Sequence, residues 1–185
     1  MPRWESDAQG RLERAALELF ETQGFERTSV AQIAGAAGLK ERSFYRYFPD
    51  KREVLFAGNE LEAHLVAQVE AIDPGIPPID ALLTALGTAE EAYRPREFLL
   101  RRGRVIAANP ALAERDLIKL DEIADALLPA LEHRGVEPGR ARLLIDVAIA
   151  LSRRATSRWL TEPDATLAEL VTQTAAELRE AVTLP

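Results

Sequence analysis

The 185-residue chain contains no cysteine and only two histidines, His64 and His133, which lie far apart in the sequence. Without cysteine there can be no disulfide, no thiolate metal site and no cysteine nucleophile. Two distant histidines are also too few for a histidine-based metal cluster. We therefore expect neither a metal ion nor a cofactor.

Long apolar runs are missing as well. The longest strongly apolar stretch, residues 143–151, is interrupted by Asp146 and falls far short of the roughly 20 residues that a membrane span needs. Residues 1–7 are polar and lack the apolar segment of a signal peptide. These features predict a cytoplasmic protein that does not contact a membrane.

The sequence also lacks the signatures of an enzyme. It has no glycine-rich phosphate loop of the Walker type and no Glu-x-x-His pair. His133, Asp146 and Ser152 could be drawn as a catalytic triad, but their spacing matches no known nucleophile motif. We predict that the protein is not an enzyme.

The chain does have a helical pattern over almost its whole length. Ala, Leu, Glu and Arg, all good helix formers, dominate the sequence, and no segment shows sustained alternation of apolar and polar residues. We predict an all-α protein. Glycine, proline and polar clusters separate nine helices, at about 9–23, 29–36, 40–47, 50–72, 79–92, 95–108, 111–134, 138–160 and 166–182.

Residues 24–52 have the layout of a helix-turn-helix, because two short helices are joined by a turn that contains Gly38. Ser29, followed by Gln32, fits a capping box at the start of the first of them. Apolar side chains can form a three-helix core between these helices and the preceding one. They are Leu12, Ala16, Phe20, Val30, Ile33, Ala34, Ala37, Leu39, Phe44 and Phe48.

The second short helix then has an outer face whose chemistry suits DNA. This face holds Glu41, Arg42, Ser43, Tyr45 and Arg46. Arginine can bind guanine through two hydrogen bonds, and hydroxyl groups often hold phosphates. One helix face cannot hide all four aromatic rings between residues 44 and 48, so we expect at least Tyr45 to be exposed.

The net charge of the chain at first argues against a nucleic-acid partner. The formal charge is −7 and the pI is near 5.0. Residues 27–52, however, hold six basic and two acidic residues. The acidic total therefore hides a basic segment within an otherwise acidic chain. The acidic remainder should discourage nonspecific contact with DNA.

A dense pattern of residues extends from about residue 9 to residue 56. It consists of Ala15-Ala16-Leu17-Glu18-Leu19-Phe20, Gly24-Phe25-Glu26-Arg27-Thr28-Ser29-Val30, Ile33-Ala34, Ala37-Gly38-Leu39 and Phe44-Tyr45-Arg46-Tyr47-Phe48-Pro49-Asp50-Lys51. In this pattern the chain resembles the TetR family of bacterial transcriptional regulators. The resemblance implies a helix-turn-helix DNA-binding domain over residues 1–50, followed by a helical ligand-binding and dimerisation domain over residues 51–185.

The resemblance further implies that the helix from about Lys40 is the recognition helix, which enters the major groove. It places the DNA contacts at Thr28 or Ser29, Lys40, Glu41, Arg42, Ser43, Tyr45, Arg46, Tyr47 and Lys51. The family commonly has Ser where this chain has Lys40. Lysine is a poor N-cap, so this helix is either capped by water or begins one residue later. Glu41 and Arg42 also depart from the pattern, which affects the operator sequence rather than the mode of binding.

The resemblance implies an effector site in the second domain, where the sequence is less specific. Apolar stripes on two of its helices predict a largely apolar pocket, although such stripes are more often simply core. Arg101 and Arg104 are possible anchors, but neighbouring arginines on a helix point in different directions, so not all can face a pocket. A weaker analogy suggests acyl-coenzyme A thioesters as effectors. The candidate ligand-binding residues are Tyr93, Phe98, Arg102, Ile106, Leu120, Ile123, Leu127 and Trp159.

These features together predict a ligand-responsive repressor that binds a pseudo-palindromic operator as a homodimer. The helix that starts near Asp50 would transmit the effector signal to the DNA-binding domain. The alternatives are an activator or a helical protein-interaction module. We expect the dimer to form through helices 138–160 and 166–182, unless those faces pack within one subunit. Small residues there suit close packing: Ala148, Ala150, Ser152, Ala155, Ala168, Thr172, Ala175 and Ala176.

Overall fold

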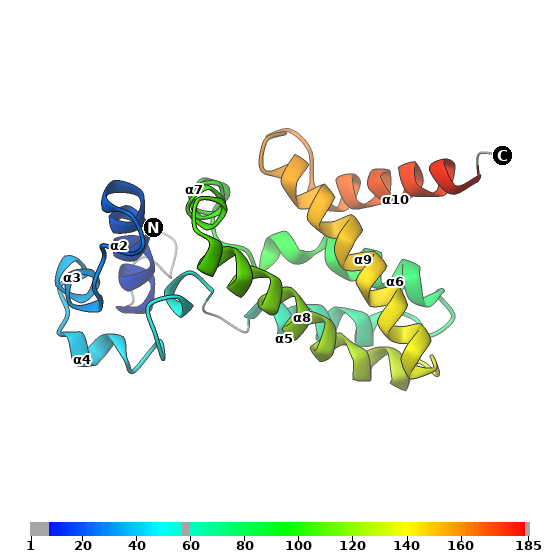
Figure 1. Cartoon of the computed structure of the whole chain (residues 1–185). Helices are drawn as coiled ribbons and strands as arrows, with labels where there is room; N and C mark the ends of the chain where they lie inside the picture. The colour runs from blue at the N-terminus through cyan, green and yellow to red at the C-terminus, as the bar shows by residue number, and fades with distance from the viewer. Residues whose placement is uncertain (1–7, 57–59, 184–185) are drawn as a thin grey trace. The chain divides into compact units, whose positions relative to one another are not determined.

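The computed structural model describes residues 8–56 and 60–183 (Figure 1). Every regular element within these ranges is a helix, which confirms the all-α prediction. Two short 3-10 helices lie in the described ranges, η1 (Glu53–Leu55) and η2 (Ala89–Glu91). The α-helices are α2 (Ala8–Gln23), α3 (Val30–Ala36), α4 (Glu41–Phe44), α5 (Glu60–Ala71), α6 (Pro78–Gly87), α7 (Arg96–Ala107), α8 (Pro110–His133), α9 (Pro138–Trp159) and α10 (Leu167–Thr183).

The prediction of one long helix over residues 50–72 is wrong. The Asp50 carboxylate accepts hydrogen bonds from the backbone N–H groups of Arg52 (2.7 Å) and Glu53 (3.3 Å), and the chain then forms only the single 3-10 turn η1. Residues 54–56, in this turn and directly after it, are all buried. Three consecutive buried side chains do not fit the stripe of an amphipathic helix. The continuous helix from Asp50 that was expected to transmit a signal is therefore not formed.

The chain divides into two compact units that interleave along the sequence. The first takes the chain up to residue 58 together with Glu97–Lys119, and the second takes residues 59–96 and the chain from Leu120 onward. Helix α8 contributes to both units. The functional division at residue 50, with DNA binding before it and effector binding after it, stays a prediction.

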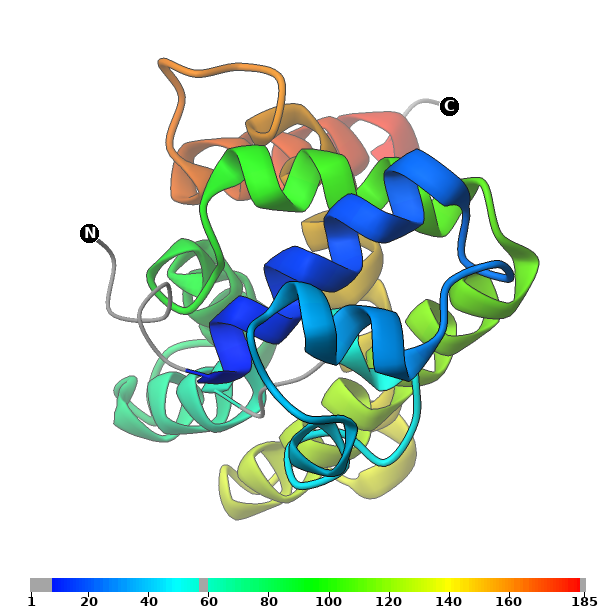
Figure 2. The same cartoon turned by 90° about the vertical axis from the view of Figure 1, so that its left-hand side faces the viewer.

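The first unit has one apolar core built from α2, α3, α4, η1 and α7. Leu12, Ile33 and Phe44 are completely buried in it. Helix α7 contributes Phe98, Val105 and Ile106 to the same core. Figures 1 and 2 both place α7 beside α2. Burial of these side chains explains why α7 belongs to the unit that contains the helix-turn-helix, although some 50 residues separate them in the sequence.

Three arginines of α7 and α8 also bind the N-terminal part of the first unit, and we call them the arginine clamp. The three contacts are Arg101 Nε to Glu21 Oε2 (3.0 Å), Arg102 Nε to the Leu55 carbonyl (2.7 Å) and Arg115 Nη2 to Glu53 Oε2 (3.0 Å). The guanidinium of Arg102 also lies 4.8 Å from the centre of the Phe56 ring. The clamp therefore joins α7 and the start of α8 to the residues on both sides of the helix-turn-helix.

The second unit packs α6 tightly against α9 and α10. Gly87, at the end of α6, allows this approach, because a Cβ atom there would lie only 3.1 Å from the Cα atom of Ala168. Arg134, just after α8, donates to the carbonyls of Ile72 (2.7 Å), Asp73 (2.9 Å) and Ile76 (2.9 Å). It thereby holds the turn between α5 and α6 in place.

The small residues of α9 and α10 serve two different faces. Ala148, Ser152, Ala155 and Ala175 are buried within the chain itself, so these four pack inside the subunit. For these four residues the alternative prediction, that the faces pack within one subunit, is confirmed. The other four small residues are exposed: Ala150, Ala168, Thr172 and Ala176.

Candidate DNA-binding interface

The turn between α3 and α4 is built as the sequence predicts. The Ser29 hydroxyl accepts a hydrogen bond from the Gln32 backbone N–H (3.2 Å), and the Gln32 side chain accepts one from the Ser29 backbone N–H (2.8 Å). This confirms the capping box. Gly38 takes a φ of 68°, the left-handed conformation that favours glycine, and Leu39 N–H then donates to the Ala34 carbonyl (2.8 Å).

Helix α4 begins at Glu41, the first helical position after an N-cap at Lys40. Lys40 occupies the N-cap position, but its side chain makes no capping hydrogen bond. Phe44 and Phe48 hold the segment to the core: both are essentially fully buried, and their ring centres lie 5.1 Å apart. The helix is shorter than predicted, since residues 45–47 form turns.

The predicted base-reading residues lie on the outside of this segment. Lys40, Glu41, Arg42 and Arg46 are exposed, and Ser43 and Tyr47 are half-buried. Tyr45 is 54% exposed, which confirms the expectation for this ring.

Most of these groups have no internal partner. Neither Lys40 nor Arg42 forms an ion pair with any residue that the structure describes. Arg46 instead donates to the Tyr47 hydroxyl (2.6 Å), and its guanidinium lies 4.8 Å from the centre of that ring. The arrangement leaves Lys40, Arg42 and Tyr45 available to an external anion.

Two of the predicted phosphate-binding side chains are used inside the fold. Thr28 is 2% exposed, and its hydroxyl donates to the Gly24 carbonyl (2.8 Å). Lys51 Nζ donates to the carbonyls of Phe25 (2.7 Å) and Thr28 (2.9 Å) and lies 4.1 Å from the centre of the Phe25 ring. Both residues therefore brace the turn between α2 and α3. Sequence reasoning missed this role because lysine and threonine are ordinarily surface residues.

The comparisons with known proteins agree with this geometry. Residues 13–57 match the family described as "Bacterial regulatory proteins, tetR family". The chain is similar to the HTH-type transcriptional regulator TcmR of Streptomyces glaucescens, with 29% identity over 86% of this chain and 76% of TcmR. It is 36% identical to the putative mycofactocin biosynthesis transcriptional regulator MftR of Mycobacterium tuberculosis, over 52% of this chain and 50% of MftR.

A solved structure extends the likeness to the whole fold. The crystal structure of Thermus thermophilus FadR, a TetR-family transcriptional repressor in complex with lauroyl-CoA, superposes with a TM-score of 0.58. Its sequence is 27% identical, and the match covers 96% of both chains. The chain belongs to the TetR family. It is accordingly a DNA-binding transcriptional regulator with a helix-turn-helix.

Three of the predicted effector-binding residues of this TetR-family protein lie in the first unit. Phe98 and Ile106 are part of its core. Arg102 belongs to the arginine clamp and also pairs with Asp116 (3.1 Å). These side chains are committed to contacts within the unit that contains the helix-turn-helix. Their helical spacing could not reveal which face of the fold they would pack against.

The other five predicted effector residues lie in the second unit. Ile123 and Leu127 are buried there, and Leu120 is half-buried. The rings of Tyr93 and Trp159 pack 5.9 Å apart, and the Arg96 guanidinium covers Trp159 at 4.2 Å from the ring centre. The Trp159 indole N–H is buried without a hydrogen-bond partner among the described residues.

The structure gives no sign of a metal centre or of a membrane span in the ranges that it describes. No three or more His, Asp or Glu side chains are placed there to hold a metal ion. No described helix is both long enough and apolar enough to cross a bilayer.

Proposed function

We propose that this TetR-family regulator is a repressor that binds a pseudo-palindromic operator as a homodimer and is released by a small-molecule effector. The observation that carries the proposal is the state of α4. Two buried rings, Phe44 and Phe48, fix this helix, and it presents exposed Lys40 and Arg42 that have no ion-pair partner among the described residues. Cations held ready on a rigid helix suit the phosphates and guanine edges of a major groove.

The contact set that we propose for DNA omits the side chains of Thr28 and Lys51. These two act indirectly, by fixing the turn that leads into α3. In the proposed complex Arg42 reads a base, while Tyr45 and the exposed N-terminal end of α3 at Ser29 hold phosphates. The other residues that we propose to face the groove are Lys40, Glu41, Ser43, Arg46 and Tyr47.

We propose that the effector binds in the second unit and has an elongated apolar part. The support is the lauroyl-CoA complex of the FadR structure, together with the apolar character of Ile123 and Leu127. Trp159 supplies a polar anchor in this proposal, because its buried indole N–H lacks an acceptor. The remaining proposed contacts are Tyr93 and Leu120.

Helix α8 is the proposed route of the signal. It is one continuous helix whose first half belongs to the first unit and whose second half carries Ile123 and Leu127. The arginine clamp fixes its first half through Arg115. An effector that displaces the second half of α8 would therefore change how the recognition helix is held, and effector and DNA must weaken each other's binding reciprocally.

The proposed dimer uses the exposed faces of α9 and α10. Leu143 is 62% exposed and Val182 is 73% exposed, and Leu178 lies one helical turn before Val182. The exposed small residues of the same helices allow close approach of a second copy. A two-fold dimer also matches the symmetry of a pseudo-palindromic operator.

DNA binding can be tested with an operator selected from a random duplex library. Binding to the selected sequence should weaken steeply as salt rises, because phosphate contacts release counterions. Arg42→Ala should weaken binding about tenfold, which corresponds to the loss of one base contact. Arg140→Ala is the matched control, since Arg140 is an exposed arginine of the second unit without an ion pair among the described residues. Equal affinities of the two variants would contradict the proposed interface.

The effector proposal needs a separate titration. Lauroyl-CoA added to the protein–operator complex should release the DNA, and the operator should in turn weaken lauroyl-CoA binding by the same factor. Operator binding that lauroyl-CoA leaves unchanged would contradict an acyl-CoA effector while leaving the DNA-binding proposal intact.

A further inference from the structure

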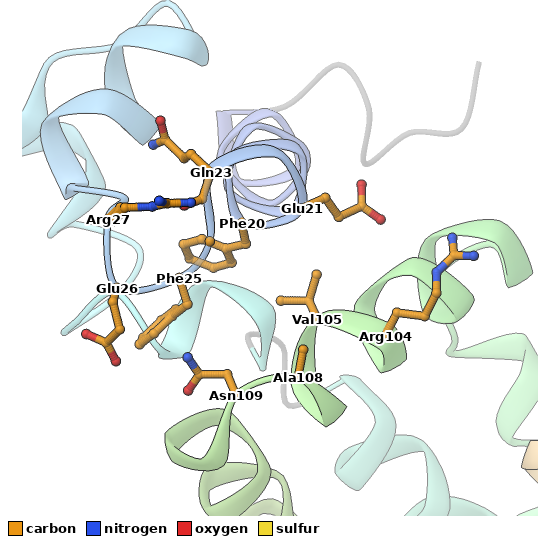
Figure 3. Close-up of a pocket in the computed structure, with 11 residues that line it drawn as sticks. Phe20, Glu21, Gln23, Phe25, Glu26, Arg27, Arg104, Val105, Ala108 and Asn109 are labelled. Carbon is orange, nitrogen blue, oxygen red and sulfur yellow. The ribbon is translucent and has the colours of Figure 1, made fainter.

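The first unit contains a cavity of about 480 Å³ that DNA binding does not use (Figure 3). It lies between the end of α2 with the turn that follows, and the end of α7 with Asn109. Every residue that lines it belongs to the first unit. Its volume falls within the range of small-molecule sites, about 300–1,000 Å³.

Two residues with little or no side chain keep this cavity open. Gly24 ends α2 with a φ of 87°, and no atom lies within 4 Å of the position that a Cβ atom would take there. Ala108, at the end of α7, also lines the cavity and is exposed. The rings of Phe20 and Phe25, edge to face with centres 5.1 Å apart, form an apolar wall with Val105 (Figure 3).

The charges around the cavity nearly cancel. Arg101 of the arginine clamp neutralises Glu21, which leaves Glu26, Arg27 and Arg104 with one positive charge in excess. Both α2 and α7 end at the cavity, and each helix C-terminus adds roughly half a negative charge. The site therefore attracts neither an anion nor a cation strongly.

Among the charged side chains and Asn109 around the cavity, free donor groups nevertheless outnumber free carboxylates. Arg104 and Glu26 form no ion pair with any residue in the described part of the chain. Arg27 engages only its Nε, which donates to the Gln23 carbonyl (2.6 Å). The Asn109 Oδ1 accepts from the backbone N–H of Ala111 (3.1 Å), so its Nδ2 is left as a donor. The lining residues thus carry three free donor groups and one free carboxylate.

We propose that this cavity is a second small-molecule site, for an uncharged, flat and largely apolar compound that carries carbonyl or ether oxygens. The apolar part lies against Phe20, Phe25 and Val105, and the oxygens accept from Arg27, Arg104 or Asn109. Such a compound touches both α7 and the turn that leads into α3. The site is independent of the effector site proposed in the second unit and requires no DNA.

Nile red tests the proposal, because it is an uncharged, flat dye with carbonyl and ether oxygens that fluoresces in apolar surroundings. Ala108→Trp fills the cavity from an exposed position, and Ala107→Trp places the same ring on the neighbouring exposed alanine outside the cavity. In titrations of the full chain, Ala108→Trp should lose one dye molecule per chain, or bind it at least tenfold more weakly, while Ala107→Trp matches the unmodified protein. Any Nile red bound in the second unit contributes equally to the unmodified protein, Ala107→Trp and Ala108→Trp, so it does not affect the comparison.

A second pair of variants does not depend on filling the cavity. Arg104→Ala should weaken Nile red binding about three- to tenfold, the usual worth of one hydrogen bond from a charged donor. Arg153→Ala, at an exposed arginine of α9, should not. The anionic dye 1-anilinonaphthalene-8-sulfonate should bind Ala107→Trp and Ala108→Trp equally. The proposal is overturned if the unmodified protein binds no Nile red, if Ala108→Trp binds it as Ala107→Trp does, or if Arg104→Ala has no effect.

Discussion

The cations of α4, the proposed recognition helix, and three arginines of the second unit are used in opposite ways. Lys40 and Arg42 are exposed and form no ion pair with a described residue. In the second unit, Arg134 donates to a series of backbone carbonyls, and Arg142 pairs with three aspartates. Arg96 likewise donates to the carbonyls after α9 while it covers Trp159.

This difference separates arginines that hold the fold from cations that can hold a ligand. A guanidinium whose donors are satisfied internally has little to offer a phosphate. Freedom alone does not identify a binding face, because Arg140, Arg153 and Arg154 of the second unit are also exposed. The cations at α4 differ because the buried rings of Phe44 and Phe48 hold this segment against the core.

The largest effect on the free energy of unfolding should come from Phe44, the buried residue of α4. Phe44→Ala removes a fully buried ring and should lower the free energy of unfolding by about 3–5 kcal/mol. Tyr45→Ala, at the adjacent exposed ring, removes only an edge-to-face contact with Phe44 (5.6 Å between centres) and should lower it by about 1 kcal/mol. Denaturant unfolding of both variants measures the contrast. Similar losses from the two would mean that the outer face of α4 is also structural.

Arg134→Ala should have the second-largest effect on the free energy of unfolding, because Arg134 donates hydrogen bonds to backbone carbonyls within the fold. Its removal leaves the carbonyls of Ile72, Asp73 and Ile76 without their charged donor, and should cost about 1–3 kcal/mol of unfolding free energy. Arg42→Ala should leave the unfolding free energy within about 0.5 kcal/mol of the original. If Arg42→Ala destabilised the protein as much as Arg134→Ala, the distinction between engaged and free cations would fail.

Ser29 combines the two roles, so its variants can sharpen the comparison. Ser29→Ala removes the N-cap of α3 and should lower the unfolding free energy by about 1 kcal/mol. Ser29→Asp keeps a capping oxygen but adds a negative charge where we propose a phosphate. It should retain the stability and lose operator affinity, as measured by unfolding and by DNA titration. Undiminished affinity of Ser29→Asp would remove Ser29 from the interface.

The smallest effect concerns the Asp50 carboxylate. Burial raises its pKa, but the hydrogen bonds from the Arg52 side chain and from the backbone N–H groups of Arg52 and Glu53 outweigh burial, so the pKa lies below its ordinary value. A lowered pKa stabilises the fold above the unfolded-state pKa, near 3.9, and this contribution is lost as the pH falls through the folded-state value. Unfolding measured between about pH 5 and pH 3 should therefore lose less stability in Asp50→Asn than in the original protein.

Local signals predicted the helix-turn-helix well. The capping box at Ser29, the left-handed turn at Gly38 and the exposure of Tyr45 all follow from short-range geometry that the sequence displays. The missing side-chain cap at Lys40 follows from the poor capping ability of lysine in the same way.

Contacts between distant segments were much harder to predict. Nothing in the spacing of Phe98 and Ile106 shows that α7 packs with a helix-turn-helix that lies some 50 residues earlier. The arginine clamp was missed for the same reason, because a guanidinium pairs equally well with many carboxylates. Residues 50–56 show a different difficulty: Asp50 caps the backbone N–H groups of Arg52 and Glu53 as at a helix start, but only the turn η1 follows, and residues 54–56 are buried together in a long-range core.

The internal hydrogen bonds of Lys51 have a consequence for the chemical labelling of this protein. Lysine occurs at only three positions in the chain, and the Lys51 ammonium is occupied by two carbonyls and an aromatic ring. Amine-reactive reagents should therefore modify exposed Lys40 in preference to Lys51. A dye coupled through Lys40 would lie at the N-cap of α4, the proposed recognition helix, so a cysteine introduced into this cysteine-free sequence is the better place for a reporter.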